Sequence, residues 1–315
     1  MKFVADRYIL TALSFWFFAL LLICLPPYQF PPDSLVTINQ GETITGVAGQ
    51  LQNQSIITSR LLFRGLVALL SPETGVVAGE YSFTNPASLV AVVKAVTDPN
   101  GGGRAVRLTF PEGLNNRELA EIARKTLGDD FKVDVFLQYA AKYEGYLFPE
   151  TYFVAKSIDE GDLVKLMRRT FDERIVEIES DIASSTVPFS DLVIMASILH
   201  GEAYTEKTMQ KVAGVLWNRI SLDMPLQVDA VFKYFLGRTT FELTLDDLGH
   251  ESTYNTYKNK GLPPTPINNP GLAAIRAAAN PAKIDALFYL TGRDGMFYFS
   301  KTFDEHKSNK FKYLR

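Results

Sequence analysis

The sequence is poor in the residues that form covalent cross-links and zinc sites. Its 315 residues include one cysteine, Cys24, and three histidines. A single cysteine excludes an intrachain disulfide and any zinc site that needs two thiolates. His200 and Glu202 match the start of a zinc-deaminase motif, but the cysteine pair that this chemistry requires is missing. His250 and His306 have no metal-type spacing, so we expect neither a metal nor another cofactor.

An excess of basic residues is also absent. The chain has 32 Lys and Arg against 35 Asp and Glu, which gives a formal net charge of -3. The phosphates of nucleic acid demand a basic face, so nucleic acid is not expected as a partner. The remaining composition, 47% hydrophobic and 21% charged, is ordinary for a globular protein and does not indicate disorder. The length allows two domains.

Long hydrophobic runs are confined to one place, the uncharged stretch Tyr8–Leu25. As a helix it would rise about 27 Å, close to a hydrocarbon thickness of about 30 Å. Lys2 and Arg7 precede it, and this basic flank predicts a cytoplasmic N-terminus. We therefore expect a single transmembrane helix with nearly all of the chain on the far side of the membrane. A cleaved signal peptide is the alternative, although no small-residue cleavage site follows the run.

Strand and helix patterns alternate after the hydrophobic run, up to about residue 130. The expected strands are Leu35–Asn39, Gly79–Phe83 and Val106–Phe110, and the expected helices are Thr43–Leu51, Thr58–Leu70, Pro86–Val96 and Asn116–Leu127. Val36–Gly41 and Leu108–Gly113 resemble each other, and each precedes a helix. This echo fits either a repeated strand-turn-helix unit, as in small wall-binding modules, or plain turn chemistry.

Helices dominate beyond residue 131. They are expected at Asp134–Lys142, Asp159–Ser180, Ser190–Glu202, Lys207–Leu222 and Pro270–Ala278, and strands return only at Ala286–Thr291 and Met296–Ser300. Ser190 would be the N-cap of the third of these helices. The predicted fold class is α+β, with one transmembrane helix, a small α+β module, and a mainly helical domain with a few strands.

Glu202 is the most unusual residue of the helical half, because it shares a helix face with apolar side chains. Leu192, Met195, Leu199 and Glu202 follow one another at spacings of three, four and three. Desolvation on that face would raise the pKa of the carboxyl group, as in a Glu that acts as general acid near neutral pH. Alternatively, Gly201 ends the helix, and Glu202 turns into solvent or pairs with an arginine.

Two further stretches have compositions that core packing does not explain. Glu144–Tyr152 places two carboxylates and three aromatic rings around a proline, so Tyr146 is a candidate for substrate contact. In Met224–Asp229, Gln227 and Asp229 alternate as two residues on one side of an extended segment do. A buried turn explains the first stretch equally well, and a helix cap explains the second.

A third stretch, Ser252–Pro270, combines polar aromatic residues with prolines. Tyr254, Asn255 and Tyr257 carry hydrogen-bonding groups that suit a polyhydroxyl ligand. Three prolines within four residues fix the backbone and remove donors. The segment is suited to be the rigid wall of a binding groove, although proline-rich loops also serve as simple connectors.

Seven motifs stand in a defined order along the chain. They are Glu144–Tyr152, Ala196–Glu202, Val212–Arg219, Met224–Asp229, Tyr254–Tyr257, Gly261–Pro264 and Pro266–Gly271. This order resembles the endolytic murein transglycosylase family (MltG, YceG-like), and the resemblance covers nearly the whole chain. It implies a cytoplasmic tail and anchor over residues 1–30, a LysM-like module over 31–130 and a lysozyme-related catalytic domain over 131–315. It also implies a bacterial inner-membrane protein whose catalytic domain is periplasmic.

The resemblance implies a reaction on peptidoglycan glycan strands. The β-1,4 bond between N-acetylmuramic acid and N-acetylglucosamine would be cleaved without water, leaving a 1,6-anhydro end. Glu202 matches the catalytic glutamate of the family and would serve as both acid and base. The expected substrate-binding residues are Gln227, Asp229, Tyr254, Asn255, Tyr257 and Tyr146. Such enzymes trim nascent strands beside penicillin-binding proteins and so end strand growth.

The chain departs from the family pattern at five positions. His200 stands in place of a glutamate, Ala203 in place of a threonine, and Phe297 where histidine is common. Val228 and Ala230 replace the serine and proline that flank the motif aspartate. These changes leave the proposed acid in place and alter its surroundings, so its protonation behaviour cannot be carried over from relatives.

Two other functions fit the same residues. A muramidase would hydrolyse the same bond with Asp229 as the second carboxylate, because ordinary glycosidases use two carboxylates about 5 to 9.5 Å apart. A non-catalytic scaffold of the wall-synthesis machinery would keep the fold and lose the chemistry, which the departures around Glu202 would also fit. Product mass separates the two enzymes, since an anhydro product is one water lighter than a hydrolytic one.

Overall fold

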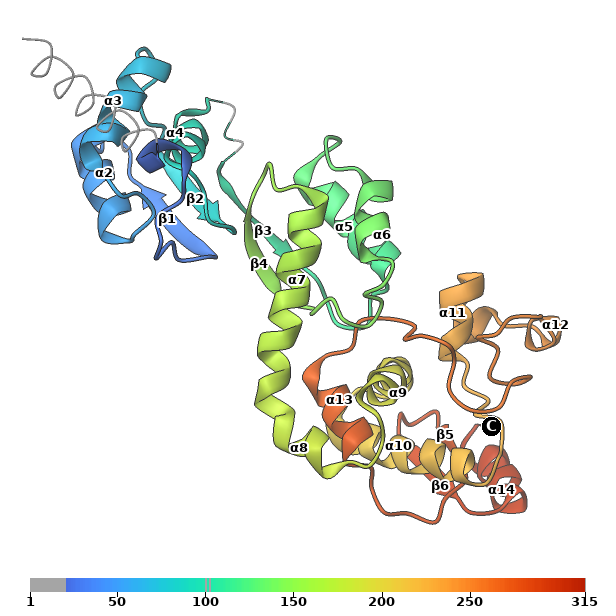
Figure 1. Ribbon diagram of the computed structural model, residues 1–315. Coiled ribbons are helices and arrows are strands. Elements are labelled where there is room, and N and C mark those ends of the chain that lie inside the picture. The colour runs from blue at the N-terminus through green and yellow to red at the C-terminus, as the bar shows by residue number, and fades with distance from the viewer. Residues whose placement is uncertain (1–20, 100, 102, 315) are drawn as a thin grey trace, which may run out of the picture. The chain divides into compact units, whose positions relative to one another are not determined.

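The computed structural model describes residues 21–99, 101 and 103–314, which fall into two compact units (Figure 1). The N-terminal unit contains the chain up to Thr109 together with Ala123–Phe131 and Thr151–Leu163. The C-terminal unit contains Phe110–Ile122, Lys132–Glu150 and the chain from Val164 onward. Each unit is described by itself. The mixture of helices with small antiparallel sheets is an α+β architecture, as the sequence predicts.

The expected membrane helix, Tyr8–Leu25, lies outside the described residues except for its last five positions. Within the described ranges, no single helix is long and apolar enough to cross a membrane. One pair of helical segments there, Glu160–Ser184 and Phe189–Glu202, reaches the required length and composition, with a bend of 107° between them.

The described part of the N-terminal unit contains two antiparallel strand pairs and the whole of helices α2, α3 and α4. The elements are β1 (Ser34–Ile38), α2 (Ile44–Asn53), α3 (Arg60–Leu70), β2 (Gly79–Phe83), α4 (Leu89–Thr97), β3 (Ala105–Thr109) and β4 (Thr151–Ala155). Strand β1 pairs with β2, and β3 pairs with β4. Thr43, Ser59 and Ser88 cap the three helices, because each side-chain oxygen accepts a backbone N–H of the first turn.

The strand-turn-helix echo is present in the structure. Gly41 follows β1 with φ 81°, and Gly113 follows β3 with φ 78°, and both positions precede a helix. A left-handed backbone of this kind favours glycine, which explains why both turns end in this residue. The two segments therefore share their turn geometry as well as their sequence pattern.

The C-terminal unit is mainly helical. Its elements are α5 (Asn116–Leu127), α6 (Val133–Ala140), α7 (Glu160–Ile175), α8 (Glu179–Ser184), α9 (Phe189–Glu202), α10 (Glu206–Ser221), α11 (Ala230–Leu236), α12 (Leu245–Leu248), α13 (Leu272–Ala279), β5 (Phe288–Thr291), β6 (Phe297–Ser300) and α14 (Phe303–Tyr313). The last residues of α5 and the first of α7 belong to the N-terminal unit. Strands β5 and β6 pair antiparallel, with Tyr289 opposite Phe299.

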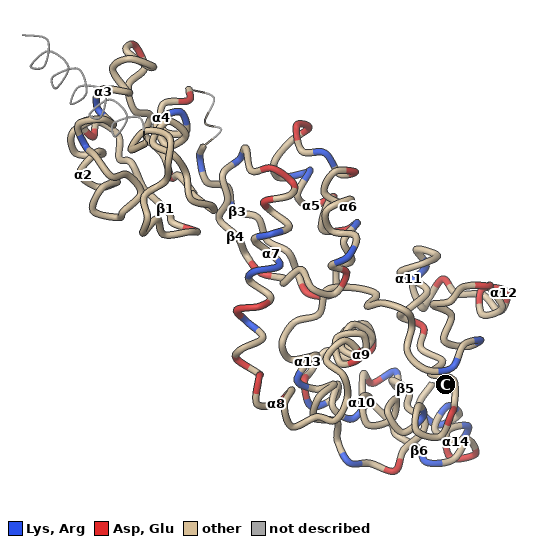
Figure 2. Tube along the Cα trace, in the orientation of Figure 1, with Lys and Arg blue, Asp and Glu red and all other residues tan. Residues whose placement is uncertain are grey.

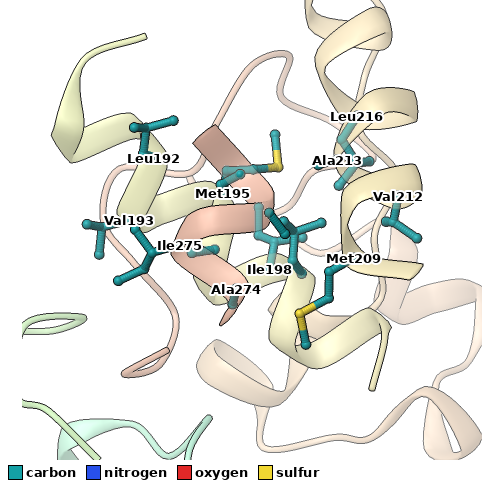
Figure 3. Close-up of a cluster of buried hydrophobic side chains, with 14 of the residues drawn as sticks. Leu192, Val193, Met195, Ile198, Met209, Val212, Ala213, Leu216, Ala274 and Ile275 are labelled. Atoms are coloured by element: carbon teal, nitrogen blue, oxygen red, sulfur yellow. The ribbon is translucent and has the colours of Figure 1, made fainter. Parts of the chain in front are cut away.

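Helices α9, α10 and α13 hold the core of this unit (Figure 3). Leu192 to Leu199 of α9 are buried without interruption, so this helix is apolar on nearly every side. Met209, Val212 and Leu216 of α10 pack into the same cluster. Charged residues instead mark the length of α7 (Figure 2). The core therefore fixes α9 rigidly, and with it the position of the helix's last residue.

Several expectations match the structure closely and others are wrong. The predicted strand Gly79–Phe83 and helix Asn116–Leu127 have the bounds that the structure shows. The expectation that, beyond residue 131, strands return only at Ala286 is wrong, because β4 (Thr151–Ala155) lies before that point and pairs with β3. In β4, the alternate residues Tyr152 and Val154 are buried, as the two-residue period of a strand requires. The proline and carboxylates of the preceding motif indicated a turn and hid this period. Helices α11 and α14 were not expected.

The predicted N-cap of α9 is also wrong. Pro188 holds that position, and Ser190 lies inside the helix, where its hydroxyl donates to Asp191 Oδ1 at 3.2 Å. The carbonyl of Pro188 accepts the N–H groups of Asp191 and Leu192 at 3.0 and 3.1 Å. Proline pre-sets the backbone dihedral at a helix start without a side-chain cap, so the helix begins earlier than the serine suggests.

Candidate functional site

Glu202 is the last residue of α9. The helix continues through Gly201, and Ala203 closes it by donating its N–H to Leu199 O at 2.9 Å. Gly201 lies against the start of α11, where a Cβ on this residue would come within 2.6 Å of the Ala230 Cβ. The glycine thus permits a close approach of the two helices beside the carboxyl group.

The Glu202 carboxyl is held by neutral donors. The Tyr289 hydroxyl donates to Oε2 at 2.8 Å, and the Ala230 N–H donates weakly to Oε1 at 3.4 Å. Among the described residues, no lysine or arginine pairs with it. The alternative in which Gly201 ends the helix and Glu202 faces solvent or an arginine is therefore wrong.

This environment raises the pKa of Glu202 above its usual range. Burial is the main cause, and the negative charge of Asp229 adds to it. The hydrogen bonds from Tyr289 and Ala230 act in the opposite direction and are too weak to cancel the effect of burial. A carboxyl group that keeps its proton toward neutral pH can act as a general acid, as the apolar stripe in the sequence predicts.

Tyr289 is a site residue that the sequence reasoning missed. It lies on β5, and its ring stacks on Phe297 of β6 with centroids 6.4 Å apart and planes at 25°. Burial and the adjacent Glu202 carboxyl raise the pKa of Tyr289 well above its usual value, so the phenol stays protonated and remains a donor. The sequence offered one indication of its role, a tyrosine within the predicted strand Ala286–Thr291. Phe297, where the family commonly has histidine, supports this ring.

Asp229 and Tyr257 form a second pair beside Glu202. Asp229 precedes α11 at its N-cap position, but its side chain makes no capping bond. Its Oδ1 instead accepts the Tyr257 hydroxyl at 2.6 Å. Burial, followed by the hydrogen bond to Asp229, raises the pKa of Tyr257, which therefore also stays a phenol. Both residues were predicted as substrate contacts, and the structure brings them together.

Arg219 and Gln227 fix the loop that leads to Asp229. Arg219 of α10 is only 6% exposed and donates to Leu226 O at 2.7 Å and to Gln227 Oε1 at 2.8 Å. Its guanidinium carbon lies 5.2 Å from the centre of the Phe288 ring. Gln227 is exposed and has φ 54°, which is rare for a residue with a side chain. Burial lowers the pKa of Arg219 from its ordinary value.

The predicted residues Asn255 and Tyr254 have different surroundings. Asn255 is fully buried, donates to Leu248 O at 3.0 Å and His250 O at 2.8 Å, and accepts the Tyr257 N–H at 3.0 Å. These bonds hold the loop that carries Tyr257. The Tyr254 hydroxyl lies 2.8 Å from Thr265 Oγ1.

Tyr146 belongs to a separate pocket of the same unit, which we call the Glu144 pocket. Its volume is about 210 Å³, and its lining consists of Ala141, Lys142, Glu144, Tyr146, Ser190, Ile194, Pro264, Thr265 and Pro266. Tyr146 packs edge-on against Phe171, with centroids 5.3 Å apart. Glu202 follows Ile194 by eight helical residues, a rise of about 12 Å along α9. The structure therefore does not group Tyr146 with Glu202.

His200, the departure two residues before Glu202, contacts another part of the unit. Its Nδ1 lies 3.6 Å from Glu112 Oε2, and a Cβ on Gly113 would come within 2.0 Å of its ring. Burial lowers the pKa of His200, which favours the neutral imidazole. Within the described residues, no group of three or more His, Cys, Asp or Glu side chains is arranged to hold a metal.

Comparisons with known proteins extend over most of the chain. An endolytic murein transglycosylase of Bacillus subtilis is 30% identical over 318 residues, covering 92% of this chain and 88% of that protein. An endolytic murein transglycosylase of Streptococcus pneumoniae is 26% identical over 335 residues, covering 90% of this chain. The chain spans 61% of the length of the streptococcal protein.

A solved structure and a family model give the same assignment. The crystal structure of a yceG-like protein from Listeria monocytogenes matches with a TM-score of 0.60 and 26% identity, covering 88% of this chain and 98% of that one. The sequence model described as the YceG-like family matches residues 36–312. That match runs from β1 into α14, and so, as its motif order predicts, the chain belongs to the YceG-like family.

Proposed function

We propose that the chain is a membrane-anchored endolytic murein transglycosylase. It cleaves the β-1,4 bond between N-acetylmuramic acid and N-acetylglucosamine in glycan strands and leaves a 1,6-anhydro end. The observation that carries this proposal is the Glu202 carboxyl, which is partly buried, has a raised pKa and, among the residues that the structure describes, accepts hydrogen bonds from neutral donors only. The names of the relatives from Bacillus and Streptococcus support the same reaction.

A single carboxyl group suffices for this reaction. Protonated Glu202 donates its proton to the glycosidic oxygen as the bond to C1 of the muramyl residue breaks. The resulting carboxylate then accepts the proton of the C6 hydroxyl of the same residue while the C6 oxygen closes onto C1. Glu202 ends protonated, and no water is consumed. The Tyr289 phenol stabilises the carboxylate in between, because its hydrogen bond favours the anion.

The surrounding predicted residues bind the glycan in this proposal. Arg219 holds the Gln227 side chain and Asp229 holds the Tyr257 hydroxyl, and the polar groups of Gln227 and Tyr257 suit acetamido and hydroxyl groups of a sugar. The buried Asn255 shapes the loop rather than touching sugar. Tyr254 and Tyr146 contact parts of the substrate farther from the cleaved bond.

The rest of the chain brings this site to its substrate. We assign residues 1–30 to a cytoplasmic tail and single-pass inner-membrane anchor, 31–130 to a LysM-like wall-binding module, and 131–315 to a periplasmic catalytic domain. The hydrophobic run in the sequence and the paired strand-turn-helix segments support this organisation. The enzyme then acts on nascent strands beside penicillin-binding synthases and ends their elongation.

A muramidase is the second candidate. The observation that favours it is the effect of the Asp229 charge on the pKa of Glu202. Two carboxyl groups that influence each other can serve as an acid and a nucleophile or base. In the structure, however, the Asp229 carboxylate is engaged by Tyr257 at 2.6 Å. This engagement supports a positioning role for Asp229, and so we prefer the lytic reaction.

Digestion of purified sacculi by the detergent-solubilised full-length chain tests the proposal. We expect fragments with anhydro ends, and loss of about 100-fold or more of the activity in Glu202→Gln. Glu177→Gln, which changes an exposed surface carboxylate, serves as the control and retains activity. Fragments one water heavier would establish a muramidase. Absence of any cleavage by the wild type would favour the non-catalytic scaffold.

A further inference from the structure

The Glu144 pocket contains a carboxyl group that the cleavage reaction does not use. Glu144 is partly buried, and its Oε1 accepts the Asn116 N–H at 3.0 Å at the start of α5. Its Oε2 has a long contact of 3.5 Å with the Tyr234 hydroxyl, and within the described part of the chain this is its one hydrogen-bond partner. One oxygen is therefore committed to the fold, and the carboxyl group, which lines the pocket, has spare capacity to accept a hydrogen bond at the other.

The surroundings of Glu144 provide no countercharge. Among the described residues, no lysine or arginine forms an ion pair with it, and the negative charge of Glu118 adds to the effect of burial on its pKa. Lys142 also lines the pocket, but it is exposed and its ammonium lies 5.0 Å from the centre of the Tyr143 ring. Burial raises the pKa of Glu144 to about 7. A bound cation would offset the cost of burying the charged carboxylate, and so would favour that form.

Much of the pocket lining is apolar. Ile194 of α9, Pro264 and Pro266 form much of its lining, together with the ring of Tyr146. Pro264 and Pro266 carry no N–H, so these two residues offer no backbone donor to a sugar hydroxyl or carbonyl group. The other polar side chains of the lining are those of Lys142, Tyr146, Ser190 and Thr265. A volume of about 210 Å³ is smaller than a site for a whole small molecule, which has about 300 Å³ or more, and fits one group of a larger substrate.

The pocket is held in shape by a buried amide pair. The Asn269 side chain accepts the Leu147 N–H at 2.9 Å and donates to Asn116 Oδ1 at 3.0 Å. Asn116 in turn donates to Ala140 O at 2.9 Å. The segment that carries Glu144 is thus fixed on both sides, which pre-organises the carboxyl group for a ligand.

We propose that the Glu144 pocket binds an aliphatic side chain that ends in an ammonium group, supplied by a diamino acid in the peptide stem of the glycan substrate. The methylene groups lie along Ile194 and the prolines, and the ammonium reaches Glu144. This inference rests on the proposed function for the presence of a peptidoglycan substrate. The chain would then bind the peptide stem as well as cleave the glycan.

Kinetics of the full-length chain on three matched substrates test the inference. These are uncross-linked strands with free stem amines, the same strands with the amines acetylated, and strands stripped of peptide. For the wild type, we expect acetylation to raise KM about tenfold with little change in kcat, since a charge-assisted contact is lost. Glu144→Gln, which retains an oxygen for the Asn116 N–H, should show the higher KM on free-amine strands and no further effect of acetylation.

Glu118→Gln is the matched control, because it removes a neighbouring carboxylate outside the pocket lining. It should discriminate between free and acetylated amines as the wild type does. Equal discrimination by Glu144→Gln and the wild type overturns the inference. If Glu144→Gln raised KM on stripped strands as much as on free-amine strands, the pocket would bind sugar instead of a stem amine. That result would also overturn the inference.

A binding measurement separates this inference from the cleavage reaction. Released stem peptide, with its amine free or acetylated, is titrated into the full-length chain by calorimetry. Tighter binding of the free amine, lost in Glu144→Gln, supports the pocket even if no strand is cut. Equal binding of both peptides removes the ammonium from the pocket, whatever the enzyme does to glycan.

Discussion

The hydroxyl of Tyr289 lies 2.8 Å from Glu202 Oε2, so that the last residue of α9 is joined to the first hairpin strand after α13. Since a phenol can only favour the charged form of a carboxyl group that it donates to, this contact restrains a pKa that burial raises. The two largest influences on the pKa of Glu202 are therefore opposed: burial raises it, and the hydroxyl group of Tyr289 lowers it.

Tyr289→Phe should move the pH dependence of cleavage upward. Glu202 must start protonated, so activity falls as pH rises through its pKa. Loss of the phenol removes a contact that favours the carboxylate, the pKa rises further, and the alkaline limb of kcat/KM shifts to higher pH. Rates on glycan strands across the pH range measure this. Tyr298→Phe, whose hydroxyl binds Asp294, is the control, and a downward shift of the limb in Tyr289→Phe would contradict the assignment.

Arg219→Lys should loosen the loop that carries Asp229. The guanidinium makes two directed hydrogen bonds, to Leu226 O and Gln227 Oε1. Lysine lacks the planar fork of donors, so its single ammonium group cannot make both bonds. We expect a loss of about 1 to 3 kcal/mol in the free energy of unfolding and a fall in kcat/KM. Arg293→Lys at an exposed site is the control. Unchanged stability and activity in Arg219→Lys would show that these bonds do not hold the loop.

Gly201→Ala should reduce activity more than it changes the fold. The new methyl group would meet Ala230 Cβ at 2.6 Å and push the start of α11 away from Glu202. A misplacement of about 1 Å at the reacting groups can cost about 100-fold in rate. The control is Gly65→Ala in α3, where no atom lies within 4 Å and the substitution should stabilise the helix by about 0.5 to 1 kcal/mol. Equal activity of the two variants would refute the steric argument.

Glu144→Gln should flatten the pH dependence of stability. Below pH 4.5, the ordinary pKa of this group, Glu144 is protonated in both states and costs nothing. As pH rises from 4.5 to about 7, the unfolded chain releases its proton first, so the folded state loses up to about 3 kcal/mol. The variant lacks this loss.

Urea unfolding at pH 5 and pH 8, followed by the fluorescence of Trp217 in the same unit, measures the difference. The advantage of Glu144→Gln over the wild type should grow with pH. A constant difference between the two proteins would mean that Glu144 ionises as freely in the folded chain as in the unfolded one.

The position of Glu202 was predictable because it depends on a local period. Leu192, Met195 and Leu199 recur at helical spacing, and burial of that face follows from geometry alone. Tyr289 was not predictable in the same way. It is 87 residues from Glu202 in sequence, and nothing local in a half-buried strand shows which helix end it will meet.

The same distinction separates the loop residues. The composition around Tyr257 and Asp229 indicated polar groups near a groove, yet it could not show that they bind each other. For Asn255 the same composition was silent about burial, because an amide serves a sugar or a loop backbone equally well. Glu144 stood in a recognised motif, but the sequence did not show that neutral groups, the Asn116 N–H and the Tyr234 hydroxyl, would be its hydrogen-bond partners among the described residues.

Because Glu202 is the last residue of α9, its carboxyl group lies at the negative end of the helix macrodipole. The aligned peptide groups of thirteen preceding residues oppose an anion there before any side chain is considered. The position of Glu202 at the helix end thus adds to the effect of burial in favouring the protonated carboxyl group, and the departures from the family pattern at His200 and Ala203 leave that position unchanged. An equivalent glutamate on the first turn of α9 would face the opposite field and release its proton more readily.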